Sequence, residues 1–195
     1  MKPIWPEILR VTLVGSAQGL LLAAFVVGVL RAPPQEFIVA CGGASIFLLA
    51  GGVCASFFDA GRPRRAAFAA VLAPLDFVLL GTASGFTLAV PLAVFTFPPL
   101  TGVLALTAFS VSAVAYLVRC ASLLWNARRR PTPAAIALAV RWAFLVLVFP
   151  LPAWLLGWGG GSVEAYMAAF VLQFAGLLAE RWHEGVINLA SHATR

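Results

Sequence analysis

Long apolar runs, each about as long as a helix needs to cross a lipid bilayer, dominate this chain. The 195 residues are 62% hydrophobic and only 10% charged, whereas soluble domains average about 25% charged residues. A water-soluble core could not absorb this much leucine, alanine, valine and phenylalanine, so the natural solvent of the chain is a bilayer. The sequence therefore predicts an all-α integral membrane protein, with residues 1–195 forming one transmembrane domain, a bundle of about six helices.

Turn-forming or basic segments separate the apolar runs and set the boundaries of the predicted helices. The expected spans are residues 8–30, 37–57, 75–97, 100–125, 135–158 and 163–182. Residues 66–73 are too short to span and are expected to form a helical lead-in at the interface, and residues 183–195 form a short polar tail. Pro91 is expected to break or bend the third helix. Gly42-Gly43 and Gly51-Gly52 are expected to allow close helix contacts in the second helix.

Basic residues are distributed unevenly between the two ends of the predicted bundle. Six spans put the N-terminus, the loops 58–74 and 126–134 and the tail on one side, which we call the basic pole because it holds nearly every arginine. The other side holds only Arg31. Cytoplasmic loops carry an excess of lysine and arginine, so the basic pole and both termini are predicted to be cytoplasmic.

The formal net charge of +6 does not indicate nucleic acid as a partner. The basic residues sit between apolar runs and form no patch on a soluble domain. They fit topology signals and contacts with anionic membrane lipids instead.

Cysteine and histidine usage argues against a metal group in this chain. Cys41, Cys54 and Cys120 lie singly in apolar runs, and an iron–sulfur cluster held by this chain would need four thiolates. The two histidines, His183 and His192, lie beyond the last apolar run. We therefore expect neither a metal ion nor a haem held inside the bundle.

Ionisable and amide side chains inside a membrane are costly, so each is a functional candidate. Asp76, Arg119 and Arg141 fall near the basic pole in the third, fourth and fifth predicted helices. Either a mutual pair or cavity explains their depth, or the arginines extend to lipid headgroups. Gln18, the one amide deep in the first helix, either bonds a neighbouring helix or lines a polar headgroup pocket.

A short segment after the second helix, residues 58–66, concentrates charge at the basic pole. Its charged members are Asp59, Arg62, Arg64 and Arg65. Gly61 and Pro63 impose a sharp turn that would hold the neighbouring side chains at a fixed depth.

This segment resembles the membrane-anchor subunits of the dimethyl sulfoxide reductase type, within the wider polysulfide reductase-like group of molybdoenzyme anchors. The similar pieces touch most of the chain: an opening Trp-Pro, Ser-Ala-Gln-Gly at residues 16–19, Gly-x-Pro-x-Arg-Ala at 61–66, Ala-Ser-Gly at 83–85 and Ala-Gly-Leu-Leu-Ala-Glu-Arg at 175–181.

The resemblance implies a haem-free subunit that docks an iron–sulfur subunit and a molybdopterin catalytic subunit, and that exchanges electrons between the nearest cluster and a membrane quinone (menaquinone or ubiquinone). Such a chain is a non-catalytic or quinone-reactive part of an oxidoreductase complex. The candidates for quinone binding or proton relay are Asp59, Arg62, Arg65, Gln18, Asp76, Arg119 and Arg141. The candidates for partner docking are Gly61, Pro63, Arg64, Arg128, Arg129 and Arg130.

The chain departs from the family pattern in helix number and at two positions. The family usually has more helices than the six expected here. A histidine commonly stands where this chain has Asp59, and an acidic residue where it has Gly81. Asp59 is a candidate to take over the proton-relay role, because a carboxylate near Arg62 and Arg65 can titrate and hydrogen-bond a quinone oxygen.

The location of the basic pole bears on the direction of electron flow. If partners dock at a cytoplasmic pole of a bacterial inner-membrane protein, we expect oxidation of a cytoplasmic substrate coupled to quinone reduction. The alternatives are a small transporter and a purely structural anchor without a quinone site.

Overall fold

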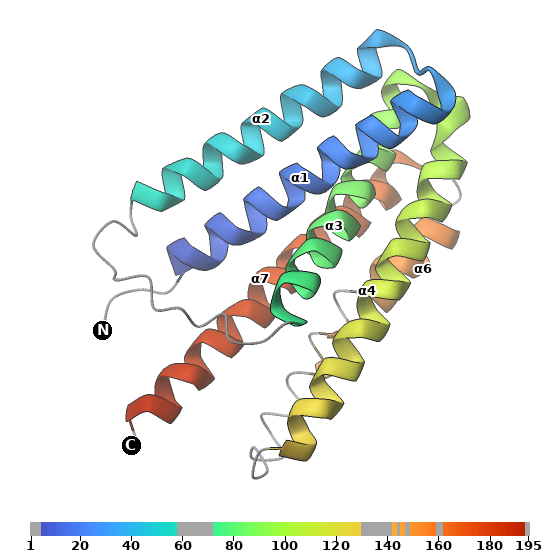
Figure 1. Cartoon of the computed structure of the whole chain (residues 1–195). Helices are drawn as coiled ribbons and strands as arrows, with labels where there is room; N and C mark the ends of the chain where they lie inside the picture. The colour runs from blue at the N-terminus through green and yellow to red at the C-terminus, as the bar shows by residue number, and fades with distance from the viewer. Residues whose placement is uncertain are drawn as a thin grey trace.

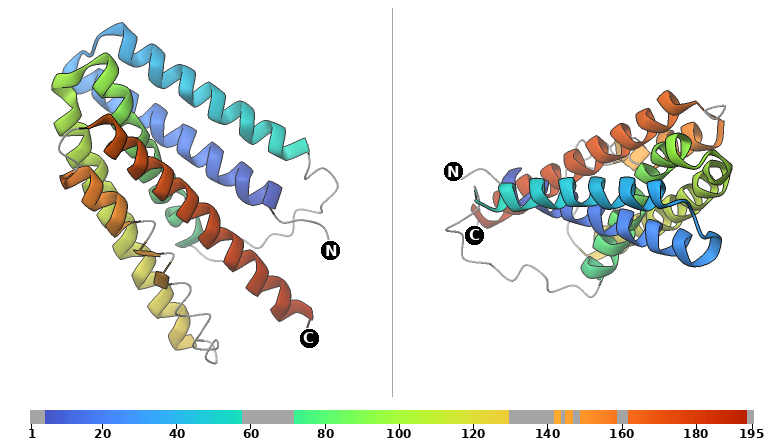
Figure 2. Two further views of the ribbon diagram at one scale, coloured as in Figure 1. Left: turned by 180° about the vertical axis from the view of Figure 1, so that it is seen from behind. Right: turned by 90° about the horizontal axis from the view of Figure 1, so that it is seen from above.

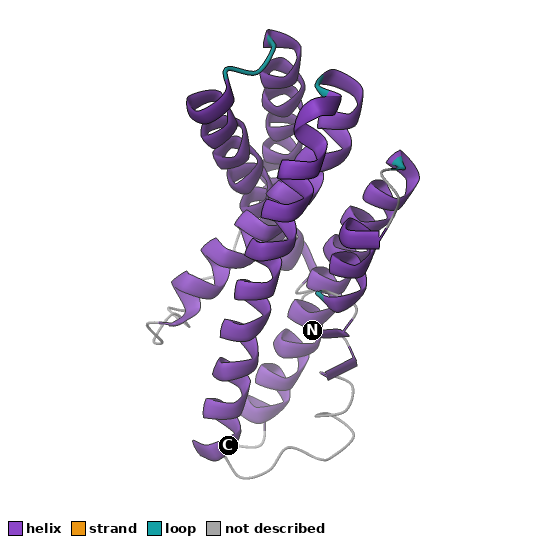
Figure 3. Cartoon of the chain, turned by 90° about the vertical axis from the view of Figure 1, so that its right-hand side faces the viewer, coloured by secondary structure: helices purple, strands orange, loops and turns teal. Residues whose placement is uncertain are grey.

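The computed structural model describes residues 5–57, 72–129, 142–143, 145–146, 149–158 and 162–193. Over these ranges the chain is helical apart from short connections, and no strand occurs in them (Figure 3). The elements are α1 (Trp5–Arg31), α2 (Gln35–Phe57), α3 (Leu72–Thr96), the 3-10 turn η1 (Pro98–Leu100), α4 (Thr101–Arg129), α6 (Pro150–Trp158) and α7 (Val163–Ala193) (Figure 1).

Five described helices are long and apolar enough to cross a membrane, which confirms the predicted all-α membrane bundle. Their apolar spans are Trp5–Arg31, Gln35–Phe57, Val78–Thr96, Pro98–Ala121 and Val163–Trp182. The predicted span at 135–158 lies partly outside the described residues. Its described pieces, which include α6, are mostly helical.

Helix ends are where the sequence-based boundaries fail most. The last apolar span ends at Trp182 as expected, but the helix does not end there, because α7 continues through the polar residues that follow to Ala193. Loss of hydrophobicity marks where a helix leaves the lipid, and it does not stop the backbone hydrogen bonding that propagates the helix. Likewise α4 continues to Arg129, and α3 begins at Leu72. The rest of the expected lead-in, residues 66–71, lies outside the described residues.

Pro91 does not break α3. The helix passes through this proline and ends at Thr96, and the Phe97 amide still donates to the Ala93 carbonyl over 2.7 Å. Proline removes one backbone donor, a loss that transmembrane helices tolerate when neighbouring helices pack around it.

The helices form a bundle in which α3 is central. It packs against α1 on one side and α4 on the other, and it also contacts α7, while α2 packs mainly on α1. The start of α1, the end of α2 and the end of α7 lie at the same end of the bundle (Figures 1 and 2). This end corresponds to the basic pole of the sequence analysis.

The closest helix contact joins α1 and α3 through glycines. A methyl group added at Gly81 would lie 2.7 Å from the carbonyl oxygen of Gly15. One added at Gly19 or Gly85 would overlap the backbone of the facing helix. Both helices thus carry a Gly-x-x-x-Gly pattern, which lets two backbones approach within van der Waals contact in a membrane.

A buried hydrogen bond lies within this same contact. The hydroxyls of Ser16 and Ser84 are 2.8 Å apart, and Ser16 Oγ also donates to the Thr12 carbonyl over 2.9 Å. Residue numbers rise together along the two helices, so α1 and α3 run parallel.

The glycines of α2 divide into packed and open positions. A methyl group at Gly52 would lie 2.8 Å from Val14 Cγ2 on α1, so the expectation of a close contact there is confirmed. The same expectation is wrong for Gly42 and Gly43, which have no neighbouring atom within 4 Å to constrain an added methyl group.

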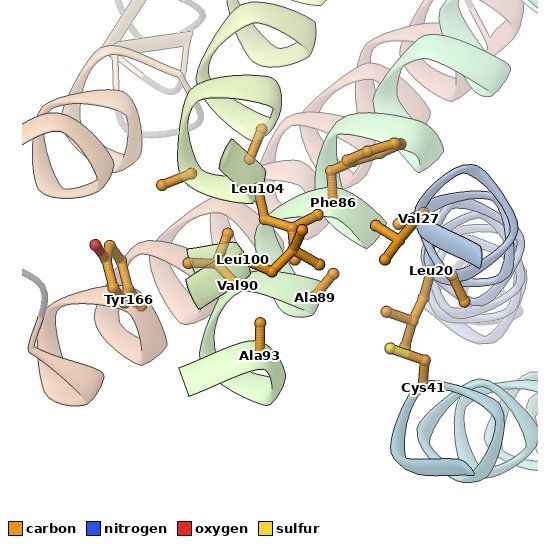
Figure 4. Packing of buried hydrophobic residues seen from close by; sticks show 14 of the residues in the cluster. Leu20, Val27, Cys41, Phe86, Ala89, Val90, Ala93, Leu100, Leu104 and Tyr166 are labelled. Carbon is orange, nitrogen blue, oxygen red and sulfur yellow. The ribbon is translucent and has the colours of Figure 1, made fainter. Parts of the chain in front are cut away.

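An apolar cluster fills the half of the bundle away from the basic pole (Figure 4). Helices α1, α2, α3, α4, α6 and α7 all contribute to it. Its labelled members are Leu20, Val27, Cys41, Phe86, Ala89, Val90, Ala93, Leu100, Leu104 and Tyr166.

We expect Gly85→Ala to destabilise the bundle by about 1–3 kcal/mol, the usual effect of overpacking a tight interface. The added methyl group must push α1 and α3 apart. Thermal unfolding in detergent, followed by intrinsic fluorescence, measures the loss.

Gly43→Ala is the matched control, because it makes the same change in the open part of α2. Its midpoint should stay at or above that of the parent protein. Equal midpoints for the two variants would contradict the importance assigned to the α1–α3 contact.

Candidate functional site

A buried ion pair joins α4 and α7 near the basic pole. Arg119 Nε donates to Glu180 Oε1 over 2.7 Å, and the two side chains are only 12% and 1% exposed. Arg119 and Glu180 each lie within two residues of the end of an apolar span. Charges at this depth are costly without a partner, so the pair compensates two groups that the bilayer would otherwise penalise.

The pair resolves an alternative that the sequence left open. Arg119 was expected to have a partner or cavity, or else to extend to the lipid headgroups. The structure shows a partner, but it is Glu180, which was not among the candidates. Its position at the end of the last span, level with Arg119, was the available signal.

The next residue along α7 binds a different helix. Arg181 Nη1 donates to Thr12 Oγ1 on α1 over 3.3 Å, and Thr12 Oγ1 in turn donates to the Ile8 carbonyl over 2.9 Å. Successive residues of a helix point about 100° apart. Glu180 and Arg181 therefore connect α7 to α4 and to α1 at one level of the bundle.

A second polar contact lies deeper between α4 and α7. Gln173 Nε2 donates to Ser112 Oγ over 3.2 Å, and both side chains are buried. Gln173 precedes Glu180 by seven positions on α7, and Ser112 precedes Arg119 by seven positions on α4. This contact therefore lies about 10 Å further from the basic pole than the ion pair. We call the four residues Ser112, Gln173, Arg119 and Glu180 the polar seam. Because residue numbers rise together along it, α4 and α7 run parallel.

Two buried polar atoms, Gln173 Oε1 at mid-span and Arg10 Nε nearer the basic pole, make no hydrogen bond to any described residue, and neither does Thr101 Oγ1 at the opposite end of the bundle. An amide oxygen buried in this way is costly. Sequence reasoning missed both residues, because helical register decides which polar side chains face inward.

Few of the predicted site residues have described side chains. Gln18 is exposed on α1 and takes no part in the buried polar contacts, whereas Arg119 is central to them. Asp76, Arg128 and Arg129 lie in α3 and α4, where only the backbone is described. Asp59, Gly61, Arg62, Pro63, Arg64, Arg65, Arg130 and Arg141 lie outside the described residues.

Two of the segments that carried the family resemblance meet in space. Residues 16–19 and 83–85 form the α1–α3 contact, joined by the Ser16–Ser84 hydrogen bond. Gly81 belongs to the same contact. A carboxylate side chain has no room at position 81, because its Cβ alone would meet the Gly15 backbone. The absence of an acid there is thus coupled to the close packing of the two helices.

Within the described ranges, no group of three or more histidine, cysteine, aspartate or glutamate residues is placed to hold a metal ion. Comparisons with protein-family models, curated proteins and solved structures found no match. Fold and site together therefore define a class, an all-α membrane protein with a buried polar seam at one end of its bundle.

We expect Glu180→Leu to destabilise the folded protein by about 3 kcal/mol, because it removes a buried partner from Arg119. Arg119→Leu should have a similar effect. The double variant Arg119→Leu/Glu180→Leu should lose clearly less than the sum of the two single losses, since it buries no charge at this position. Unfolding in detergent, measured for all four proteins, gives the coupling free energy. Strictly additive losses would contradict the ion pair.

Proposed function

We propose that this protein is a haem-free membrane-anchor subunit of the bacterial inner membrane. It docks an iron–sulfur subunit at the basic pole and exchanges electrons with a membrane quinone. The molybdopterin subunit that oxidises the substrate is bound through the iron–sulfur subunit. Electrons flow from a cytoplasmic substrate to the quinone.

The observation that carries this proposal is the pair of charged side-chain contacts at one end of the bundle, Arg119 with Glu180 and Arg181 with Thr12. Charged and polar side chains inside a membrane are retained mainly where they serve a function. The Arg119–Glu180 pair and the Arg181–Thr12 contact lie at the pole where α2 ends, just before the charged segment 58–66 in the sequence, and the Gln173–Ser112 contact lies deeper. Electron transfer to a docked partner needs the quinone close to that pole, and polar groups there can receive its headgroup.

Quinone reduction consumes two electrons and two protons. The docked cluster supplies the electrons, so the anchor must supply the protons and hold the quinone oxygens. Asp59 is the proton-relay candidate of the loop, with Arg62 and Arg65 beside it in the sequence. Gln18, Asp76, Arg119 and Arg141 are further quinone-site candidates. Gly61, Pro63, Arg64, Arg128, Arg129 and Arg130 are the docking candidates.

Two observations disfavour the transporter alternative. Many secondary transporters carry broken helices with binding groups near mid-membrane, whereas α3 passes unbroken through Pro91. The described core away from the basic pole is also apolar, so the described residues offer no polar path through the whole membrane.

Asp59→Asn should lower quinone reduction by the assembled complex about a hundred-fold, the lower range for loss of a general acid–base group. The measurement is turnover of a short-chain quinone analogue by the purified complex. Glu36→Gln, the same chemical change at the exposed start of α2 away from the basic pole, is the control and should leave turnover unchanged. Full activity of Asp59→Asn would remove the relay role. A complex without any quinone reduction would indicate the purely structural anchor.

The C-terminus should face the cytoplasm. An alkaline phosphatase fused after Arg195 folds only in the periplasm, so it should remain inactive, and a green fluorescent protein fused there should fluoresce. Strong phosphatase activity would reverse the proposed orientation.

A further inference from the structure

The midpoint of α1 carries an amide on the outside of the bundle. Gln18 lies at the centre of the apolar span Trp5–Arg31, about 20 Å from either end. Its side chain is exposed and makes no hydrogen bond to any described residue. At this depth an exposed amide faces hydrocarbon, which offers it neither a donor nor an acceptor. A polar group from another molecule is needed to satisfy it.

An exposed hydroxyl at the same depth needs no such partner. Ser110 lies near the middle of the span Pro98–Ala121 and is exposed on α4. Its hydroxyl donates to the Leu106 carbonyl of the same helix over 2.9 Å, as serine and threonine side chains commonly do. The amide of Gln18 makes no such bond, so it marks its own face of the bundle for a polar contact.

The residues that follow Gln18 extend this face along α1. Leu22, Phe25 and Val29 come four, seven and eleven positions after Gln18, and they are 43%, 68% and 67% exposed. Alternating intervals of four and three positions form one row along a helix, the spacing at which parallel helices pack against each other. We call Gln18, Leu22, Phe25 and Val29 the open face of α1.

The open face is accessible to a further helix. Leu13 and Val14 lie against the glycines of α2, whereas Gly15 and Gly19 lie against α3. At about 100° per residue, these two sets occupy nearly opposite sides of α1, so α1 lies between α2 and α3 (Figure 1). The open face lies midway between the two sets and is therefore not recessed behind either neighbour.

A second copy of this chain supplies the group that the amide lacks. Copies of one membrane protein insert with the same orientation, so a two-fold axis that relates them runs along the membrane normal. Each residue then lies at the same depth as its counterpart, and Gln18 meets Gln18. A primary amide is self-complementary, because Nε2 donates while Oε1 accepts. A helix of another protein would need a polar residue at this same depth.

We propose that the protein forms a two-fold symmetric dimer, in which the open faces of two α1 helices pack together and the two Gln18 amides hydrogen-bond each other at mid-membrane. Leu22, Phe25 and Val29 supply the van der Waals packing, and the amide pair fixes the register. The dimer does not rest on the proposed quinone function. It does exclude Gln18 from a quinone site, because the paired amide is not available to a quinone headgroup.

Energy transfer between copies of the full chain in quinone-free lipid vesicles measures the dimer. Donor and acceptor fluorescent proteins are fused after Arg195, and dilution with lipid gives the dissociation constant. Gln18→Leu should raise this constant about ten-fold, the order expected for a lost amide hydrogen bond between transmembrane helices. Gln18→Asn keeps the amide and should raise it less. Gln35→Leu, the same change at the exposed start of α2, is the control and should leave it unchanged.

Disulfide cross-linking tests the open face itself, in a cysteine-free background with alanine at positions 41, 54 and 120. Phe25→Cys and Val29→Cys should each cross-link to their own copy when oxidised with copper phenanthroline, because the two-fold axis passes along the open face. Leu106→Cys, at a position 67% exposed on α4, is the control and should stay monomeric.

Three results would overturn the proposal: no energy transfer between copies, a Gln18→Leu protein that dimerises as tightly as its parent, or equal cross-linking at positions 25 and 106. Energy transfer that arises only after a quinone is added would overturn it as well, and would assign Gln18 to the quinone site.

Discussion

The backbone contact between α1 and α3 is the interaction on which the other helix positions depend. Lipid gives two apolar helices no hydrophobic reason to associate, so close van der Waals packing must supply the attraction. Gly19 and Gly85 supply it by removing the side chains that would hold the axes apart. α2 then packs on α1, while α4 and α7 pack on α3. The serine pair between the same helices fixes their register, since only one alignment brings Ser16 to Ser84.

Directional polar contacts between helices are distributed unevenly along the length of the bundle. Apolar clusters fill both halves of the bundle, and the attraction between their aliphatic and aromatic side chains is non-directional. From mid-span to the basic pole the bundle also contains contacts that are specific in direction, namely Arg119 to Glu180 and Gln173 to Ser112. Such contacts contribute little net stability when a charge must be desolvated. Their main structural effect is to define how α7 is placed against α4.

Hydropathy predicted the rough position of the five described spans because the bilayer imposes a minimum apolar length. It misplaced the end of α7, because leaving lipid and ending a helix are different physical events. It also favoured Gly42 and Gly43 as contact sites, although these residues face no neighbour, and composition alone does not tell which face of a helix is packed. The partner of Arg119 was missed for a related reason: pairing across helices depends on the register of α4 and α7, which the single chain does not reveal. Most other predicted site residues lie outside the described ranges.

The neighbouring residues Glu180 and Arg181 have a mechanical consequence. Glu180 binds Arg119 on α4 and Arg181 binds Thr12 on α1, from positions about a quarter-turn apart around α7. Rotation of α7 about its own axis would stretch both contacts at once, so together they fix the rotational position of α7 at the end of its apolar span. The eleven residues from His183 to Ala193 continue the same helix beyond the apolar span. Their orientation about the helix axis is therefore set by the same two contacts.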